Sequence, residues 1–179
     1  IRTREIHTSL KLMKLITNCL VYDNHGRRKN FLTFLSRMSK LESGEIVLEE
    51  IPFNLSSIFK EVFVVIEQMA AEQNIRIVWE KKEITHRKLI GSPGHVKRVM
   101  MNILSNAVKY NRENGHVYIS CMEIPSEQPE MTTMEFVCRD TGIGMTDEFQ
   151  KHIFEPFAQE HAGSRTKFAG TGLGMPITK

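Results

Sequence analysis

Residues 102–110 read Asn-Ile-Leu-Ser-Asn-Ala-Val-Lys-Tyr and combine two helical patterns in one short stretch. Asn102, Asn106 and Lys109 are spaced by four and three residues, so they share one face of a helix that Pro93 can open. Apolar residues occupy the opposite side. A polar helix face is most simply a solvated surface. An amide oxygen is, however, also a suitable ligand for Mg²⁺ that holds phosphate oxygens, and a lysine supplies a positive charge for phosphate.

Two glycine clusters follow this helix in the sequence. Asp140-Thr-Gly142-Ile-Gly144 directly follows a predicted strand, which places a carboxylate beside backbone that can approach a ligand closely. Gly170-Thr171-Gly172-Leu173-Gly174 precedes apolar residues where a helix can begin with its amides directed at an anion. Neither cluster has the ending of a P-loop or opens a βαβ unit of the Rossmann type. Each is a weak signal alone, but together they indicate a phosphate-binding site.

The first part of the chain predicts a helical hairpin. Apolar residues at three- and four-residue steps predict one amphipathic helix over residues 6–20 and another over residues 31–41, with turn residues at 23–26 between them. Such a pair buries only one seam. We therefore expect residues 1–44 to form a hairpin that dimerises into a four-helix bundle.

The remaining residues, 45–179, predict an α+β domain. The patterns indicate a strand over 45–50, a helix capped by Asn54, a strand over 75–79, the helix from Pro93, and strands over 116–122 and 134–139, with a loose loop over 125–133. This order favours an α/β sandwich in which helices cover one face of a mixed or antiparallel sheet.

The composition sets loose limits on partners and compartment. The net charge of +3 is small and the charges are interspersed, so we do not expect nucleic acid as a partner. Cys19, Cys121 and Cys138 are far apart and match neither a disulfide framework nor a metal site, which favours reduced thiols in the cytoplasm. No apolar stretch approaches the ~20 residues that a membrane span needs, so we expect any membrane anchor to lie outside this chain.

The order and intervals of these motifs resemble those of sensor histidine kinases, most closely the hybrid type. Residues 102–110 are similar to the N box of that family, 140–144 to its first glycine box, and 170–174 to its second. Ile153-Phe-Glu-Pro-Phe157 resembles the F box. Residues 38–44 and 52–55 resemble the exit of the dimerisation hairpin and the entry to the ATP-binding domain. The resemblance covers essentially the whole chain.

The resemblance implies an ATP site of the Bergerat type. Asp140 would accept a hydrogen bond from the adenine amino group, Asn106 would help to hold Mg²⁺, and Asn102, Lys109 and Tyr110 would flank the phosphates and the base. Residues 158–169 would form a mobile lid, with Arg165 and Lys167 as candidates for phosphate contacts and Phe154 and Phe157 as packing residues that anchor it. Asn106 and Lys109 would take part in in-line transfer of the γ-phosphoryl group to a histidine, for relay to the aspartate of a response-regulator receiver domain.

The chain departs from the family pattern in two places. No complete phosphoacceptor box is present; Ile1-Arg-Thr3 is similar to the end of that box, which would place the histidine just before Ile1, and His7 is the other candidate. The sequence also ends soon after the second glycine box, where the family has a further helix and strand, so the domain is expected to be truncated.

Two other functions remain open. A related ATPase of the gyrase and chaperone type uses the same nucleotide site with a glutamate that activates water, whereas the neutral amide of Asn102 cannot take a proton. A module that binds nucleotide or dimerises without kinase activity is the second alternative. Acid-labile, base-stable phosphate on the protein after incubation with labelled ATP would separate it from a kinase.

Overall fold

The computed structural model describes residues 11–21, 49–80, 83–125, 131–155 and 158. Within these ranges one six-stranded sheet has the order β2-β4-β1-β6-β5-β3. Its strands are β1 (Lys11–Val21), β2 (Ile51–Asn54), β3 (Arg76–Glu80), β4 (Lys88–Gly91), β5 (His116–Pro125) and β6 (Met131–Asp140). β3 and β5 are parallel and the other neighbouring strands are antiparallel, so the sheet is mixed, as predicted.

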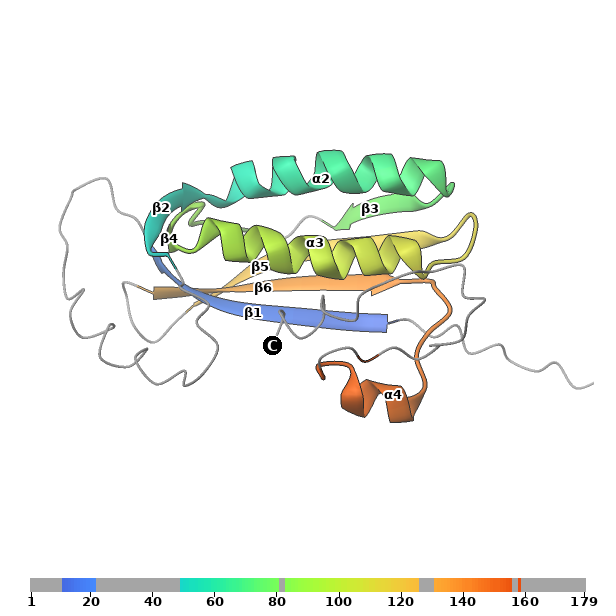
Figure 1. Ribbon diagram of the computed structural model, residues 1–179. Coiled ribbons are helices and arrows are strands. Elements are labelled where there is room, and N and C mark those ends of the chain that lie inside the picture. Colours follow the sequence, from blue (N-terminus) through green and yellow to red (C-terminus); the bar gives the residue numbers. More distant parts are fainter. Residues whose placement is uncertain (1–10, 22–48, 81–82, 126–130, 156–157, 159–179) are drawn as a thin grey trace, which may run out of the picture.

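Two long helices cover one face of this sheet (Figure 1). They are α2 (Leu55–Glu72) and α3 (Pro93–Lys109), which pack against each other and against the strands. A short helix, α4 (Asp147–His152), follows β6 and lies away from this pair (Figure 1). The predicted cap of α2 is confirmed, because the Asn54 side chain accepts a hydrogen bond of 2.9 Å from the Ser56 amide. The architecture is therefore the expected α+β sandwich.

The hydrophobic core lies between the two helices and the sheet. The sheet contributes alternating residues of β5 and β6, and α2 contributes one face. On α3 the buried residues are Val99, Met100, Ile103, Leu104, Ala107 and Val108. Burial of this stripe leaves Asn102, Asn106 and Lys109 half-buried on the other side of the helix. The core thus fixes the direction in which the polar face of α3 points.

The prediction of a helix over residues 6–20 is wrong for the residues that the structure describes. Residues 11–21 form β1, which pairs antiparallel with β6 from Lys11 opposite Asp140 to Leu20 opposite Met131. A short apolar run can fit both a helical and a two-residue period, and pairing with a distant strand then decides between them. β1 lies in the same sheet as the elements after residue 50, so it is not part of a separate hairpin. The other residues of the expected hairpin, including His7, lie outside the described ranges.

Smaller differences concern the ends of the strands. The sequence analysis does not predict β4, which has four residues. Of the strand expected over 45–50, only residues 49 and 50 are described, and they are not part of a strand, because β2 begins at Ile51. β6 begins at Met131, inside the stretch expected to be a loop. None of the helices in the described ranges is long and apolar enough to cross a membrane.

Candidate functional site

The polar face of α3 forms the first part of the site. Its last turn continues into Tyr110, whose amide donates a 3.0 Å hydrogen bond to the carbonyl of Asn106. The Nζ atom of Lys109 lies 5.0 Å from the centre of the Tyr110 ring, within range of a cation–π contact. The amides of Asn102 and Asn106 and the ammonium group of Lys109 therefore belong to one ordered helical surface.

The second part of the site is the loop from Asp140 to Gly144, directly after β6. Asp140 is 6% exposed, and its Oδ1 atom accepts a 2.8 Å hydrogen bond from the Gly142 amide. A Cβ atom at Gly142 would lie 2.7 Å from this oxygen and closer still to the Tyr110 carbonyl, so no larger residue fits. Gly144 has φ of 78°, which also favours glycine. Both glycines of the predicted motif are needed for the backbone path of the loop.

The loop and the end of α3 are in direct contact. The Ile143 amide donates a 3.0 Å hydrogen bond to the Tyr110 carbonyl. The loop that begins at Asp140 therefore lies against Tyr110, 30 residues earlier in the chain. The backbone hydrogen bond from the Tyr110 amide to the Asn106 carbonyl connects the half-buried Asn106 to the same contact.

Several predicted site residues lie outside the described ranges. They are Arg165, Lys167, the second glycine cluster at residues 170–174, and Phe157. Phe154 is described and is 39% exposed. Residues 159–169 of the lid that it is expected to anchor lie outside the described ranges. Thr146 caps α4 by accepting a 3.2 Å hydrogen bond from the Phe149 amide, which fixes where the chain turns after Gly144.

The carboxylate of Asp140 influences its surroundings. The pKa of the Cys138 thiol is raised to about 12, first because the thiol is buried and second because the negative charge of Asp140 disfavours a thiolate. A buried carboxylate of this kind is suited to accept a hydrogen bond from a ligand's amino group, because competition from water is reduced.

Metal binding at this site would need oxygen donors from a ligand. In the part of the chain that the structure describes, no three His, Cys, Asp or Glu side chains gather as a metal site would require. An amide oxygen such as that of Asn106 is a hard donor of the kind that Mg²⁺ takes beside phosphate and water oxygens.

Sequence reasoning missed two residues that join the parts of the site. Asn111 lies directly after the α3 motif, and Thr141 lies inside the first glycine motif. The Thr141 hydroxyl donates a 3.0 Å hydrogen bond to Asn111 Oδ1. The turn residues Asn114-Gly115 were the available signal that the chain folds back at this point.

The chain is similar to proteins of a known family. Residues 91–179 match the family described as histidine kinase-, DNA gyrase B- and HSP90-like ATPase. The signal transduction histidine-protein kinase BarA of Escherichia coli K12 is 33% identical over 141 residues, which are 79% of this chain. The chain belongs to the sensor histidine kinase family.

The fold of this chain is also that of solved histidine kinase catalytic domains. The nucleotide-free catalytic domain of histidine kinase ThkA aligns with a TM-score of 0.57 and 26% identity, covering 72% of this chain and 78% of that one. Full-length ShkA in complex with AMPPNP aligns with a TM-score of 0.57 and 25% identity, covering 75% of this chain and 25% of that one. The chain spans only 15% of the length of BarA.

Proposed function

We propose that this chain binds Mg·ATP between the polar face of α3 and the Asp140–Gly144 loop and transfers the γ-phosphoryl group to a histidine. The observation that carries this proposal is the buried Asp140 carboxylate, whose loop contacts the end of the helix that bears Asn106 and Lys109. Membership of the histidine kinase family supports the same reading.

Asp140 is proposed to recognise the adenine amino group. One of its oxygens, Oδ1, is held by the Gly142 amide at 2.8 Å, which fixes the direction of the carboxylate. A carboxylate can only accept, whereas the 6-amino group of adenine donates. A base with a 6-oxo group would place two acceptors against each other, so the pairing favours adenine over guanine.

The helix face is proposed to hold the phosphates. Asn106 supplies an amide oxygen to Mg²⁺, and Lys109 supplies positive charge to phosphate oxygens, with Asn102 and Tyr110 beside them. Mg²⁺ held in this way would supply positive charge against the negative charge that develops on the transferred phosphoryl group. Arg165, Lys167 and the glycine cluster 170–174 are proposed to complete the phosphate site, on the strength of their motifs. The AMPPNP that ShkA binds is a nucleotide of the class proposed here.

The acceptor is proposed to be a histidine that relays the phosphoryl group to the aspartate of a response-regulator receiver domain. Homodimerisation of the kinase and a cytoplasmic location belong to this proposal. Asn102 favours such a transfer over hydrolysis, because a neutral amide cannot act as the general base that activates water. The kinase should therefore hydrolyse ATP slowly even when saturated.

Titration calorimetry tests the metal part of the proposal. We expect ATP to bind tightly with Mg²⁺ and weakly in EDTA, and we expect Asn106→Asp to reduce the gain in affinity that Mg²⁺ provides. Gln68→Glu, at an exposed position of α2, makes the same chemical change away from the site and should alter nothing. An unchanged dependence on Mg²⁺ in Asn106→Asp would remove Asn106 from the metal site.

Labelling with γ-³²P-ATP tests the reaction. The kinase reading predicts acid-labile, base-stable label on a histidine when the acceptor segment is present, and loss of that label when the histidine is replaced. His7→Gln would abolish the label if His7 were the acceptor. Rapid hydrolysis would instead favour the ATPase, and binding without label or hydrolysis would favour a module that signals without kinase activity.

A further inference from the structure

A network of hydrogen bonds centred on Asn111 lies beside the candidate site, at the end of α3. The side chain is 8% exposed. Its Nδ2 group donates to the carbonyls of Ala107 and His116, each at 3.1 Å. Its Oδ1 atom accepts from the Arg112 amide at 2.9 Å and from the Thr141 hydroxyl at 3.0 Å.

These bonds use the full capacity of the amide. A neutral amide offers two donors and two acceptor positions, and all four are paired here. A carboxylate at this position would face the two carbonyls without a proton to donate, so the network requires asparagine. The same bonds fix the orientation of the amide.

Thr141 closes the network on the side of the loop. Its hydroxyl accepts a 2.8 Å hydrogen bond from the His116 amide, and its own amide donates to the His116 carbonyl at 3.1 Å. Gly115 allows this approach, because a Cβ atom there would lie 2.8 Å from the Thr141 hydroxyl and closer still to Asn111 Oδ1. The end of α3, the start of β5 and the Asp140 loop are therefore joined at one point.

We propose that Asn111 and Thr141 are positioning residues that hold the end of α3 against the Asp140 loop, so that the helix face and the Asp140 carboxylate act on one nucleotide. Thr141 directly follows Asp140, and Asn111 directly follows Tyr110. A shift of either residue would therefore move one half of the site relative to the other. This proposal rests on the proposed binding of Mg·ATP. It assigns a function to two residues without requiring that they touch the nucleotide.

Valine and serine substitutions of Thr141 test the role of its hydroxyl. Thr141→Val keeps the shape but leaves the His116 amide and Asn111 Oδ1 each without one partner. We expect it to raise the Kd for Mg·ATP by at least about 5-fold, the lower limit for a buried hydrogen-bonding group that is left without a partner. Thr141→Ser restores the hydroxyl and should return the Kd to within about twofold of wild type.

Thr132→Val is the matched control. Thr132 is 2% exposed and lies on β6, at the end of the strand away from Asp140. Its hydroxyl donates a 2.8 Å hydrogen bond to Glu123. The substitution should lower stability while leaving the Kd for Mg·ATP unchanged. If Thr141→Val and Thr132→Val affect stability alike and neither changes the Kd, the network is only structural and the proposal is wrong.

A double-mutant cycle separates this proposal from the proposed function. If Thr141 acts by placing Asp140, the effect of Thr141→Val on the Kd should shrink by at least about threefold in an Asp140→Asn background. Full additivity would contradict positioning while leaving ATP binding intact. Failure of the wild-type chain to bind Mg·ATP, in contrast, would overturn the proposed function and this proposal with it.

Hydrogen exchange on the wild-type chain provides a measurement that does not depend on folding of a variant. The amides of Arg112, His116 and Thr141 donate within the network, whereas those of Thr85 and His86 donate to Glu123 elsewhere. Saturating Mg·ATP should slow exchange of the first group by at least about tenfold more than the second. Equal slowing of both groups would contradict a network coupled to the nucleotide.

Discussion

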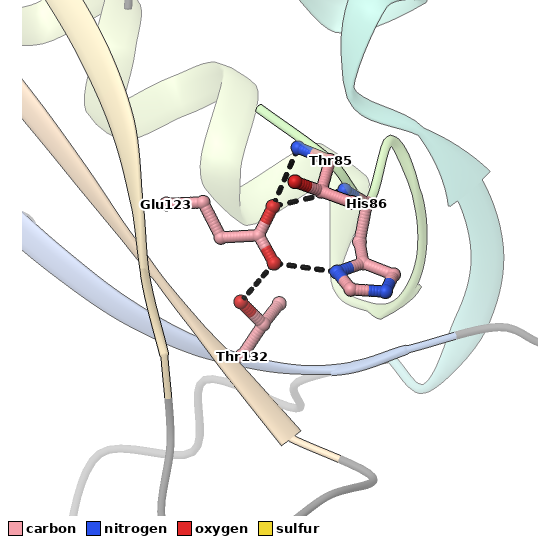
Figure 2. A network of polar contacts seen from close by, with 4 residues as sticks. All are labelled: Thr85, His86, Glu123 and Thr132. Atoms are coloured by element: carbon pink, nitrogen blue, oxygen red, sulfur yellow. Dashed lines mark hydrogen bonds and ion pairs between the residues drawn. The ribbon is translucent and has the colours of Figure 1, made fainter. Parts of the chain in front are cut away.

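The carboxylate of Glu123 is predicted to stabilise the fold at a point remote from the nucleotide site. Its Oε2 atom accepts hydrogen bonds from the amides of Thr85 at 2.7 Å and His86 at 2.9 Å. Its Oε1 atom is 2.5 Å from His86 Nδ1 and accepts from the Thr132 hydroxyl at 2.8 Å (Figure 2). One side chain of β5 thus joins the segment before β4 to β6.

Glu123→Gln keeps the size of the side chain but breaks this arrangement. An amide turned with its oxygen towards the Thr85 and His86 backbone amides keeps those two hydrogen bonds. Its NH₂ group then replaces the oxygen that accepts from the Thr132 hydroxyl and lies beside His86 Nδ1, and all of the hydrogen bonds lose the charge of the carboxylate. Hydrogen bonds to a charged group contribute about 1.5–3 kcal/mol each, and water can reach the exposed amides of Thr85 and His86. We therefore expect a loss of about 2–3 kcal/mol in the free energy of unfolding, or roughly 4–12 °C in Tm.

The loss of stability caused by Glu123→Gln should become smaller as the pH falls. Burial alone would raise the pKa of Glu123, but hydrogen bonds from the His86 side chain and amide, Thr132 and the Thr85 amide outweigh it and lower the pKa from 4.5 to about 2. A lowered carboxyl pKa gives stability that is present above pH 4.5 and is lost as the pH falls towards 2. The difference between wild type and Glu123→Gln should shrink over this window.

Urea unfolding at pH 7, 4 and 3 measures both quantities. Glu67→Gln, at an exposed position of α2, is the matched control and should leave stability unchanged within about 0.5 kcal/mol. If Glu123→Gln were as stable as wild type at pH 7, or if the difference between them did not change with pH, the reasoning from these four hydrogen bonds would be refuted.

Two further predictions concern the neighbourhood of Asp140. Gly142→Ala should raise the Kd for Mg·ATP at least about tenfold in calorimetry, because its Cβ would meet the Tyr110 carbonyl and Asp140 Oδ1. Gly94→Ala is the control and should leave the Kd unchanged, because the added carbon has open space around it. Cys138 should stay unmodified by iodoacetamide at pH 8 in the folded protein, as read by peptide mass spectrometry, because its pKa is raised to about 12 by burial and by Asp140. Rapid modification of Cys138 under native conditions would contradict its placement in the core.

Where local sequence pattern and tertiary packing agree, the fold was predictable. The apolar stripe of α3 has a helical period, begins at Pro93 and is buried as expected. β1 could not be predicted in the same way, because its partners β6 and β4 lie far along the chain and its own residues fit two periods. β4 was missed because it has only four residues, too few to establish a period.

In the candidate site too, features set by local sequence could be predicted, and features set by distant contacts could not. Gly142 and Gly144 could be predicted as turn residues, because glycine is needed where backbone passes close to another group or has a positive φ. The hydrogen bond between Thr141 and Asn111 could not be predicted, because it joins residues that are 30 positions apart. A pattern within one segment carries no information about such a contact.

Asp140 is proposed to recognise the adenine base of bound ATP. The most direct test compares the Kd values of Mg·ATP and Mg·ITP, which differ in the 6-amino and 6-oxo groups, for wild type and Asp140→Asn. The wild-type chain should prefer ATP by about 5- to 150-fold, the range expected for one unsatisfied buried hydrogen bond. Asp140→Asn should bind ATP more weakly and lose most of that preference, because an amide can present either a donor or an acceptor. Equal affinity of wild type and Asp140→Asn for ATP, with the preference over ITP retained, would contradict the assignment.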